Sequence, residues 1–243
     1  VYKRQELVQL LNEYLTSMCE VISSYNGTVD KFEGDAIIAF WGAPLDNPDH
    51  ARDGCMAALD MQERNIELRK KLREENRPML YTRMGINSGP IVVGNMGSAT
   101  KTDYTMMGDN VNLAARLEGA NKFYKTYTMI AENTYKLAED SIDVRYLDVV
   151  RVVGKNEPVK IYQLLAKKNQ LAGSMQEVLE HYEKGMNCYK NLNFKDAIMN
   201  FENALKLEPE DGPCLTYVNR CKMYLKQPPP KDWDGVFNFT EKG

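Results

Sequence analysis

Residues 30–35, D-K-F-E-G-D, bring three acids and a lysine together directly before the apolar run 36–40. Such a run is typical of a buried strand. An acid at the start of a strand, beside a glycine turn, can project its carboxylate into a cleft, and Mg²⁺ prefers carboxylate oxygens together with substrate phosphates. Asp35 is therefore a candidate metal ligand. The alternative is that Asp35 only stabilises a hairpin turn, and this segment alone favours neither interpretation.

A second polar pair lies in the segment 103–118, D-Y-T-M-M-G-D-N-V-N-L-A-A-R-L-E. Its second half predicts a helix that is apolar over most of its circumference, on which Asn112 and Arg116 share one face. Because buried polar groups need partners, this stripe indicates a cleft, where the arginine fork could bind a phosphate. The alternative is a surface pair on a half-exposed helix.

A third segment, V-V-G-K-N-E-P-V-K-I-Y at 152–162, places Gly154 and Lys155 in a turn between two strands. Lys155 could reach a phosphate as a mobile point charge. Alone this signal is weak, because most lysines in turns are simply solvated.

The hydrophobic pattern of the first 165 residues predicts strands and helices in mixture. Helices are expected at about 6–25, 47–76, 109 onward and 132–138, and strands at 28–32, 36–41, 80–87, 90–93, 104–107, 127–131, 144–153 and 158–165. This order predicts an α+β fold, with one sheet and helices packed against it.

The character of the chain changes after residue 166. We expect a polar linker at 167–174, helices over 175–227 and a tail at 228–243 that is rich in proline and aromatic residues. The helical segment resembles a tetratricopeptide repeat at Gly185, Ala197, Phe201, Ala204 and Pro209 and departs from it at His181 and Cys188. A lone repeat cannot bury its own face, so it should pack on the main domain or on a protein partner. The tail either folds back on the body, which we favour, or is a recognition strand.

Composition excludes several classes of function. The 243 residues carry a net charge of −3, which gives no case for nucleic acid as a partner. Five cysteines without C-x-x-C spacing predict free thiols. There is neither a long apolar run nor a signal peptide, so we expect a cytoplasmic location, or the cytoplasmic face of a membrane within a longer protein. The opening V-Y-K-R-Q reads like a translated library adapter, and we expect the chain to be a fragment.

Four motifs in this order resemble the catalytic domain of class III nucleotidyl cyclases over about residues 6–166. They are K-F-E-G-D-A-I-I-A-F-W-G-A-P at 31–44, R-M-G-I-N-S-G-P-I-V-V-G-N-M-G-S at 83–98, the segment 103–118, and G-K-N-E-P-V-K-I-Y at 154–162. The resemblance implies a ferredoxin-like, palm-type sheet with helices packed on it, followed here by a small all-α segment.

The resemblance also implies a mechanism. Two Mg²⁺ or Mn²⁺ ions, held by two aspartates, bind the triphosphate of ATP or GTP and activate the ribose 3′-hydroxyl for attack on the α-phosphorus. Asp35 matches the second metal aspartate and Lys155 the triphosphate-binding lysine. Asn112 matches the asparagine that orients the ribose, and Arg116 the arginine that stabilises charge in the transition state.

Two further positions match residues that read the base in this family. Lys31 stands where members that use ATP have lysine and those that use GTP have glutamate, because lysine donates to N1 of adenine. Thr105 stands at the second position, where its hydroxyl can accept from the adenine amino group. The sequence therefore favours adenylate cyclase, with guanylate cyclase as one alternative and a non-catalytic nucleotide-binding or interaction module as another.

The family builds its site at a head-to-tail dimer interface, so we expect a homodimer with two equivalent sites. Its first metal aspartate lies on a strand that precedes the first helix, and neither Asp30 nor Glu33 occupies that position. We therefore expect this chain to lack that strand and half of the metal site, and to have little or no activity by itself.

Overall fold

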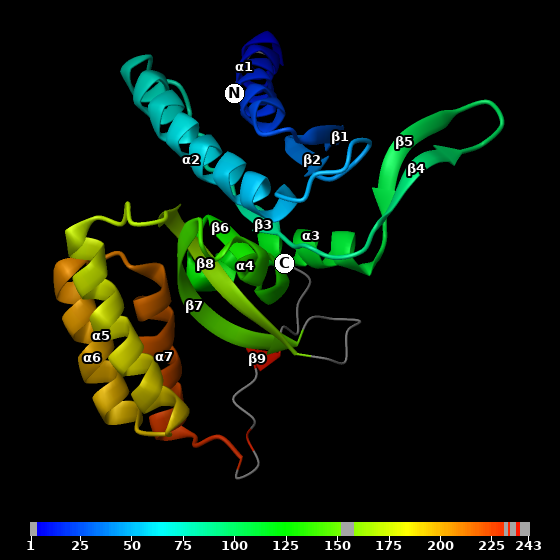
Figure 1. Ribbon diagram of the computed structural model, residues 1–243. Helices are drawn as coiled ribbons and strands as arrows, with labels where there is room; N and C mark the ends of the chain where they lie inside the picture. The colour runs from blue at the N-terminus through cyan, green and yellow to red at the C-terminus, as the bar shows by residue number, and fades with distance from the viewer. Residues whose placement is uncertain (1–3, 152–157, 231–232, 234–236, 239–243) are drawn as a thin grey trace.

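The computed structural model describes residues 4–151, 158–230, 233 and 237–238. Strands and helices are mixed along the chain up to β8, and three adjacent helices follow (Figure 1). In chain order the elements are α1 (Arg4–Ser24), β1 (Thr28–Glu33), β2 (Ala36–Phe40), α2 (His50–Glu74), β3 (Met84–Ile86), β4 (Val92–Gly97), β5 (Thr102–Met107), α3 (Asp109–Tyr124), β6 (Thr128–Ala131), α4 (Glu132–Ala138), β7 (Ile142–Arg151), β8 (Val159–Lys167), α5 (Gly173–Lys190), α6 (Phe194–Leu207), α7 (Gly212–Lys226) and β9 (Phe237–Asn238).

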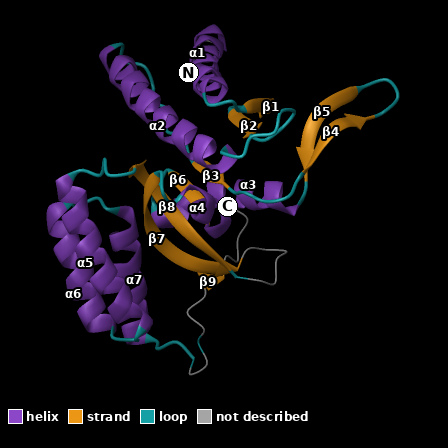
Figure 2. Cartoon of the chain, in the orientation of Figure 1, coloured by secondary structure: helices purple, strands orange, loops and turns teal. Residues whose placement is uncertain are grey.

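The main sheet has five strands in the order β3-β6-β8-β7-β9. The pairs β3–β6 and β7–β9 are parallel, and the other two are antiparallel. The predicted α+β class is confirmed, but the prediction of one sheet is wrong. Within the described residues, the hairpins β1–β2 and β4–β5 are separate two-stranded sheets, and β4–β5 extends away from the body as an arm (Figure 2).

Strand β3 is much shorter than the predicted strand 80–87. The carbonyl oxygens of Leu80 and Thr82 accept hydrogen bonds from two side chains of α2, Arg69 Nη1 at 3.3 Å and Gln62 Nε2 at 3.0 Å. Backbone acceptors satisfied by side chains in this way do not need a neighbouring strand.

The arm β4–β5 is longer than the two short strands predicted at 90–93 and 104–107. Its strands pair from Val92 with Met107 to Gly97 with Thr102. Ser98 closes the turn, because its Oγ accepts from the backbone nitrogen of Lys101 at 3.1 Å. The glycines, serine and threonines of this stretch predict a loop rather than a strand, so the sequence predicts shorter strands than the structure has.

Helix α3 lies directly against β3. A Cβ atom on Gly85 would stand 2.1 Å from the carbonyl oxygen of Ala114 and 2.3 Å from the nitrogen of Glu118, so only glycine permits this approach. Asn121 on α3 donates from Nδ2 to the carbonyl of Met84 at 3.0 Å. These contacts fix the helix that carries two predicted site residues against the edge of the main sheet.

The helices α5–α7 share one hydrophobic core with α3 and the main sheet. Thr216 on α7 donates to the carbonyl oxygen of Phe123 at the end of α3 at 3.0 Å. The described residues of the tail favour the first of the two alternatives, folding back on the body, because Trp233 packs against Tyr189 and Tyr224 and β9 extends the main sheet. The assignment of α5 and α6 to a tetratricopeptide repeat stays a prediction. All five cysteines are free thiols, as predicted.

A buried ion pair joins β7 to the start of α7 and makes stability depend on pH. Arg145 donates from Nη1 and Nη2 to the two carboxylate oxygens of Asp211 at 2.7 and 2.8 Å. Burial opposes ionisation of Asp211, but the guanidinium lowers the pKa of this carboxyl below its ordinary value. Since the folded pKa lies below the unfolded value of about 3.9, the pair stabilises the fold above that pH, and this contribution is lost as the pH falls through the folded pKa.

We therefore expect Asp211→Asn to be less stable than wild type at pH 7 and to lose less stability on acidification. Thermal unfolding between pH 7 and pH 3 checks this. Other carboxyls with lowered pKa values, such as Glu13 and Asp60, keep some acid sensitivity in the variant. Parallel stability curves for the two proteins over the whole range would contradict the assignment to Asp211.

Candidate functional site

Asp35 stands in the two-residue turn that joins β1 to β2. Glu33 pairs with Ala36 across the turn, and Gly34 has a φ of 66° while Asp35 does not have a positive φ. A two-residue turn with glycine in the left-handed region at its first position is the type II′ pattern. The Asp35 side chain is exposed at the tip of the hairpin. Burial raises the pKa of Tyr14 on α1, and the Asp35 carboxylate contributes to that shift, so the two groups lie within electrostatic range.

The described residues do not complete a metal site around Asp35. In the part of the chain that the structure describes, no group of three or more histidine, cysteine, aspartate or glutamate side chains could hold a metal ion. Asp35 offers one carboxylate, and this set of donors does not by itself fit a two-metal centre.

Asn112 and Arg116 lie on the outward face of α3. Leu113 and Leu117 bury the opposite face in the core, whereas Asn112 is exposed and Arg116 is half-buried. The helix is less enclosed than its composition predicts, because Ala115 is exposed. No hydrogen bond or ion pair within the described chain joins Asn112 or Arg116 to Asp35. Within the described residues the half-buried Arg116 also makes no ion pair, so its guanidinium has no intrachain counter-charge.

Lys31 and Thr105 come together around a residue that the sequence analysis set aside, Asp30. Thr105 on β5 donates from Oγ1 to Asp30 Oδ2 at 2.8 Å, and Lys31 Nζ lies 3.6 Å from the same oxygen. The Asp30 side chain is only 3% exposed, whereas that of Lys31 is 42% exposed. The arm β4–β5 thus touches the hairpin β1–β2 at the two predicted base-reading positions. Lys155, the remaining predicted residue, lies outside the described residues.

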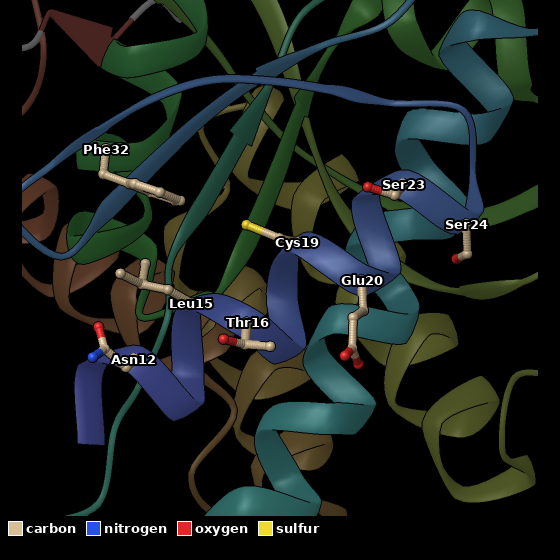
Figure 3. A pocket seen from close by; sticks show the side chains of 8 residues that line it. All are labelled: Asn12, Leu15, Thr16, Cys19, Glu20, Ser23, Ser24 and Phe32. Carbon is tan, nitrogen blue, oxygen red and sulfur yellow. The ribbon is translucent and has the colours of Figure 1, made fainter. Parts of the chain in front are cut away.

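Two hollows of the surface lie elsewhere. A groove of about 810 Å³ runs between α1 and β1, with Cys19 and Glu20 among the α1 residues along it and Phe32 opposite (Figure 3). A cavity of about 350 Å³ lies between β2, β3 and the start of α3, where Trp41, Asn87 and Asn110 contribute to its wall. Neither of these two hollows is lined by a predicted site residue of the described chain.

Comparison with known proteins identifies the fold. Residues 2–166 match the family model described as the adenylate and guanylate cyclase catalytic domain. The solved adenylyl cyclase CyaB of P. aeruginosa is similar with a TM-score of 0.63 and 33% identity over 70% of this chain and 88% of its own. The solved guanylyl cyclase Cya2 is similar with a TM-score of 0.64 and 32% identity over 70% of this chain and 85% of its own.

The fold is therefore that of a class III nucleotidyl cyclase, as the resemblance predicts. The chain belongs to the adenylate and guanylate cyclase catalytic domain family. Cyclases of this family act on nucleotide substrates as dimers and use divalent metal ions. No helix of the described residues is long and apolar enough to cross a membrane.

Two curated relatives show how much of a larger protein this chain represents. Adenylate cyclase 1 of Rhizobium meliloti is 35% identical over 161 residues, which are 66% of this chain and 24% of that protein. The terminal-differentiation specific adenylate cyclase of Dictyostelium discoideum is 31% identical over 225 residues, 91% of this chain and 10% of that protein. The chain thus spans a quarter or less of either relative. The second match, longer than the cyclase domain, reaches into α5–α7.

Proposed function

We propose that this chain is the catalytic part of an adenylate cyclase, which converts ATP to 3′,5′-cyclic AMP and pyrophosphate in intracellular signalling. The observation that carries the proposal is that Lys31 and Thr105 both contact the same carboxylate oxygen of Asp30 and so lie close together. An ammonium donor and a hydroxyl acceptor complement N1 and the 6-amino group of adenine. The names of the two curated relatives support the same choice.

The remaining site residues act on the ribose and the phosphates. The 3′-oxygen forms a bond to the α-phosphorus, the bond from that phosphorus to the bridging oxygen breaks, and pyrophosphate leaves while the hydroxyl proton passes to solvent. Asn112 orients the ribose, and Arg116 stabilises the negative charge that develops on the α-phosphate. Lys155 binds the triphosphate. Asp35 supplies one carboxylate ligand for Mg²⁺ or Mn²⁺, of which we propose two in each site.

A head-to-tail homodimer brings these residues to one nucleotide. One protomer gives Asp35, and its partner gives Lys31, Thr105, Asn112 and Arg116. The absence of any bond between Asp35 and α3 within the described chain supports this division, because each half then needs the partner's half. The helices α5–α7 remain a candidate surface for a further protein partner.

The test measures cyclic nucleotide formed from ATP or GTP with Mn²⁺. We expect little or no product from the 243-residue chain, because the described residues supply one carboxylate ligand. We expect cyclic AMP from an extended chain, defined as this chain together with any residues that its gene encodes before Val1. Within that extended chain Lys31→Glu should lower the preference for ATP, because glutamate cannot donate to N1. Robust activity of the 243-residue chain would contradict the proposal that its metal site is incomplete.

Guanylate cyclase is the second candidate, and the similarity to the guanylyl cyclase Cya2 favours it. Formation of cyclic GMP from GTP as the main reaction, with little change on Lys31→Glu, would establish this candidate. Absence of product from both nucleotides, with a folded dimer, would instead favour a nucleotide-binding module whose α5–α7 segment recruits a partner.

A further inference from the structure

Asp30 occupies a β-bulge at the centre of the base-reading pair. Val29 pairs with Ala39 and Lys31 pairs with Ile38, so Asp30 has no partner on β2. In a regular strand the side chains of residues 30 and 31 would point to opposite faces. Bulges re-aim side chains and are frequent beside active sites. Here the bulge lets the Asp30 carboxylate approach the Lys31 ammonium to 3.6 Å and also meet β5.

The hydrogen bond between Thr105 and Asp30 has only one possible direction. An ionised carboxylate accepts and cannot donate, whereas a threonine hydroxyl has one proton and two lone pairs. Thr105 therefore gives its single proton to Asp30 Oδ2, at 2.8 Å. Toward any other group, the hydroxyl oxygen can then only accept a hydrogen bond through a lone pair. A hydroxyl, normally able to donate or accept, becomes an acceptor only.

We propose that Asp30 is a positioning residue that sets base specificity by fixing the polarity of the Thr105 hydroxyl and orienting the Lys31 ammonium. This inference rests on the proposed function. Adenine presents an amino donor at position 6, which an acceptor-only hydroxyl can bind, whereas guanine presents the acceptor O6 there. With Asp30 in place, a guanine base meets a lone pair opposite O6, and the Lys31 ammonium meets its N1–H.

The experiment measures kcat/KM for ATP and for GTP with the extended chain. We expect Asp30→Ala to lower the ratio of the two values by about tenfold or more, because Thr105 becomes free to donate to O6. Asp30→Asn should restore most of the ratio, since its amide oxygen still accepts from Thr105. Asp103→Ala is the matched control, an exposed acid two residues from Thr105 on the same strand, and should leave the ratio unchanged.

A double-mutant cycle shows whether Asp30 acts through Thr105. Thr105→Val should lower the ratio by itself, and adding Asp30→Ala to it should change the ratio little further. Equal losses with ATP and GTP in Asp30→Ala would assign Asp30 a structural role and overturn the inference, as would full additivity with Thr105→Val. If the wild-type extended chain forms neither cyclic nucleotide, the proposed function itself fails. If it is active but Asp30→Ala leaves the ratio of the ATP and GTP values unchanged, only the role of Asp30 fails.

Discussion

Asp35→Ala and Arg116→Ala, each nearly inactive alone, are expected to recover about a quarter of the wild-type cyclase activity when the two extended chains are mixed and allowed to exchange. In the proposed dimer each substitution removes one half of a shared site, and loss of a group that stabilises developing charge costs on the order of 100-fold or more. Random association makes half of the dimers mixed, and each mixed dimer has one intact site of two, hence roughly a quarter of the activity.

The matched control mixes Asn112→Ala with Arg116→Ala. Both residues lie on the same face of α3 and, in the proposed dimer, belong to the same half of the site, so every site in the mixed dimer would carry one defect. This mixture should stay inactive. Recovery in the control, or no recovery in the first mixture although exchange is demonstrated, would contradict a site divided between Asp35 and α3.

The sequence predicted most of the local structure because it depends on short-range patterns. The turn at Gly34 and Asp35, and the helix α4 with both of its bounds, follow from turn residues and from hydrophobic periodicity. The prediction of a strand over 80–87 failed because side chains of α2, 11 and 20 residues earlier in the chain, satisfy two of its carbonyls. The hydrophobic pattern of the strand itself does not reveal such side-chain donors.

The same limit explains what was missed at the site. The sequence assigns Asp30 no role, because it does not occupy the position of the family's first metal aspartate. The register shift against β2, which local sequence does not reveal, brings its carboxylate beside Lys31. Its hydrogen-bond partner Thr105 lies 75 residues further on. The one available signal was an acid directly beside a predicted base-reading lysine. The site assignments remain predictions for all six residues, Lys31, Asp35, Thr105, Asn112, Arg116 and Lys155.

A second buried ion pair shows why α5–α7 form part of the catalytic body rather than a separate module. Arg220 on α7 donates from Nη1 to Asp148 Oδ2 on β7 at 2.6 Å and from Nη2 to the hydroxyl of Tyr124 at 3.2 Å. Tyr124, in the last turn of α3, donates to the same carboxylate at 2.7 Å. Strand β7 thus contributes one cation, Arg145, and one anion, Asp148. Arg145 pairs with Asp211 at the start of α7, and Asp148 pairs with Arg220 within α7.

Arg220→Leu is therefore expected to destabilise the chain by about 3–5 kcal/mol, because it leaves the Asp148 carboxylate buried without its cation. For a chain of this size that lowers Tm by roughly 10 °C. Lys222→Leu is the matched control on the same helix. Lys222 lies 3.7 Å from Glu202 in a surface pair, with both side chains more than half exposed, and the loss should stay within about 1 kcal/mol.

Replacing both charges tests whether the cost of Arg220→Leu comes from the orphaned carboxylate. Asp148→Leu combined with Arg220→Leu removes the buried anion as well, and should recover a large part of the lost stability, since apolar replacements for a buried pair are often neutral. Tyr124 then keeps an unsatisfied hydroxyl, so recovery stays incomplete. Thermal unfolding of the four proteins decides the matter. If Arg220→Leu and Lys222→Leu cost the same, the buried pair does not hold α7 on β7 and α3, and contacts among apolar side chains alone account for the docking of the three helices.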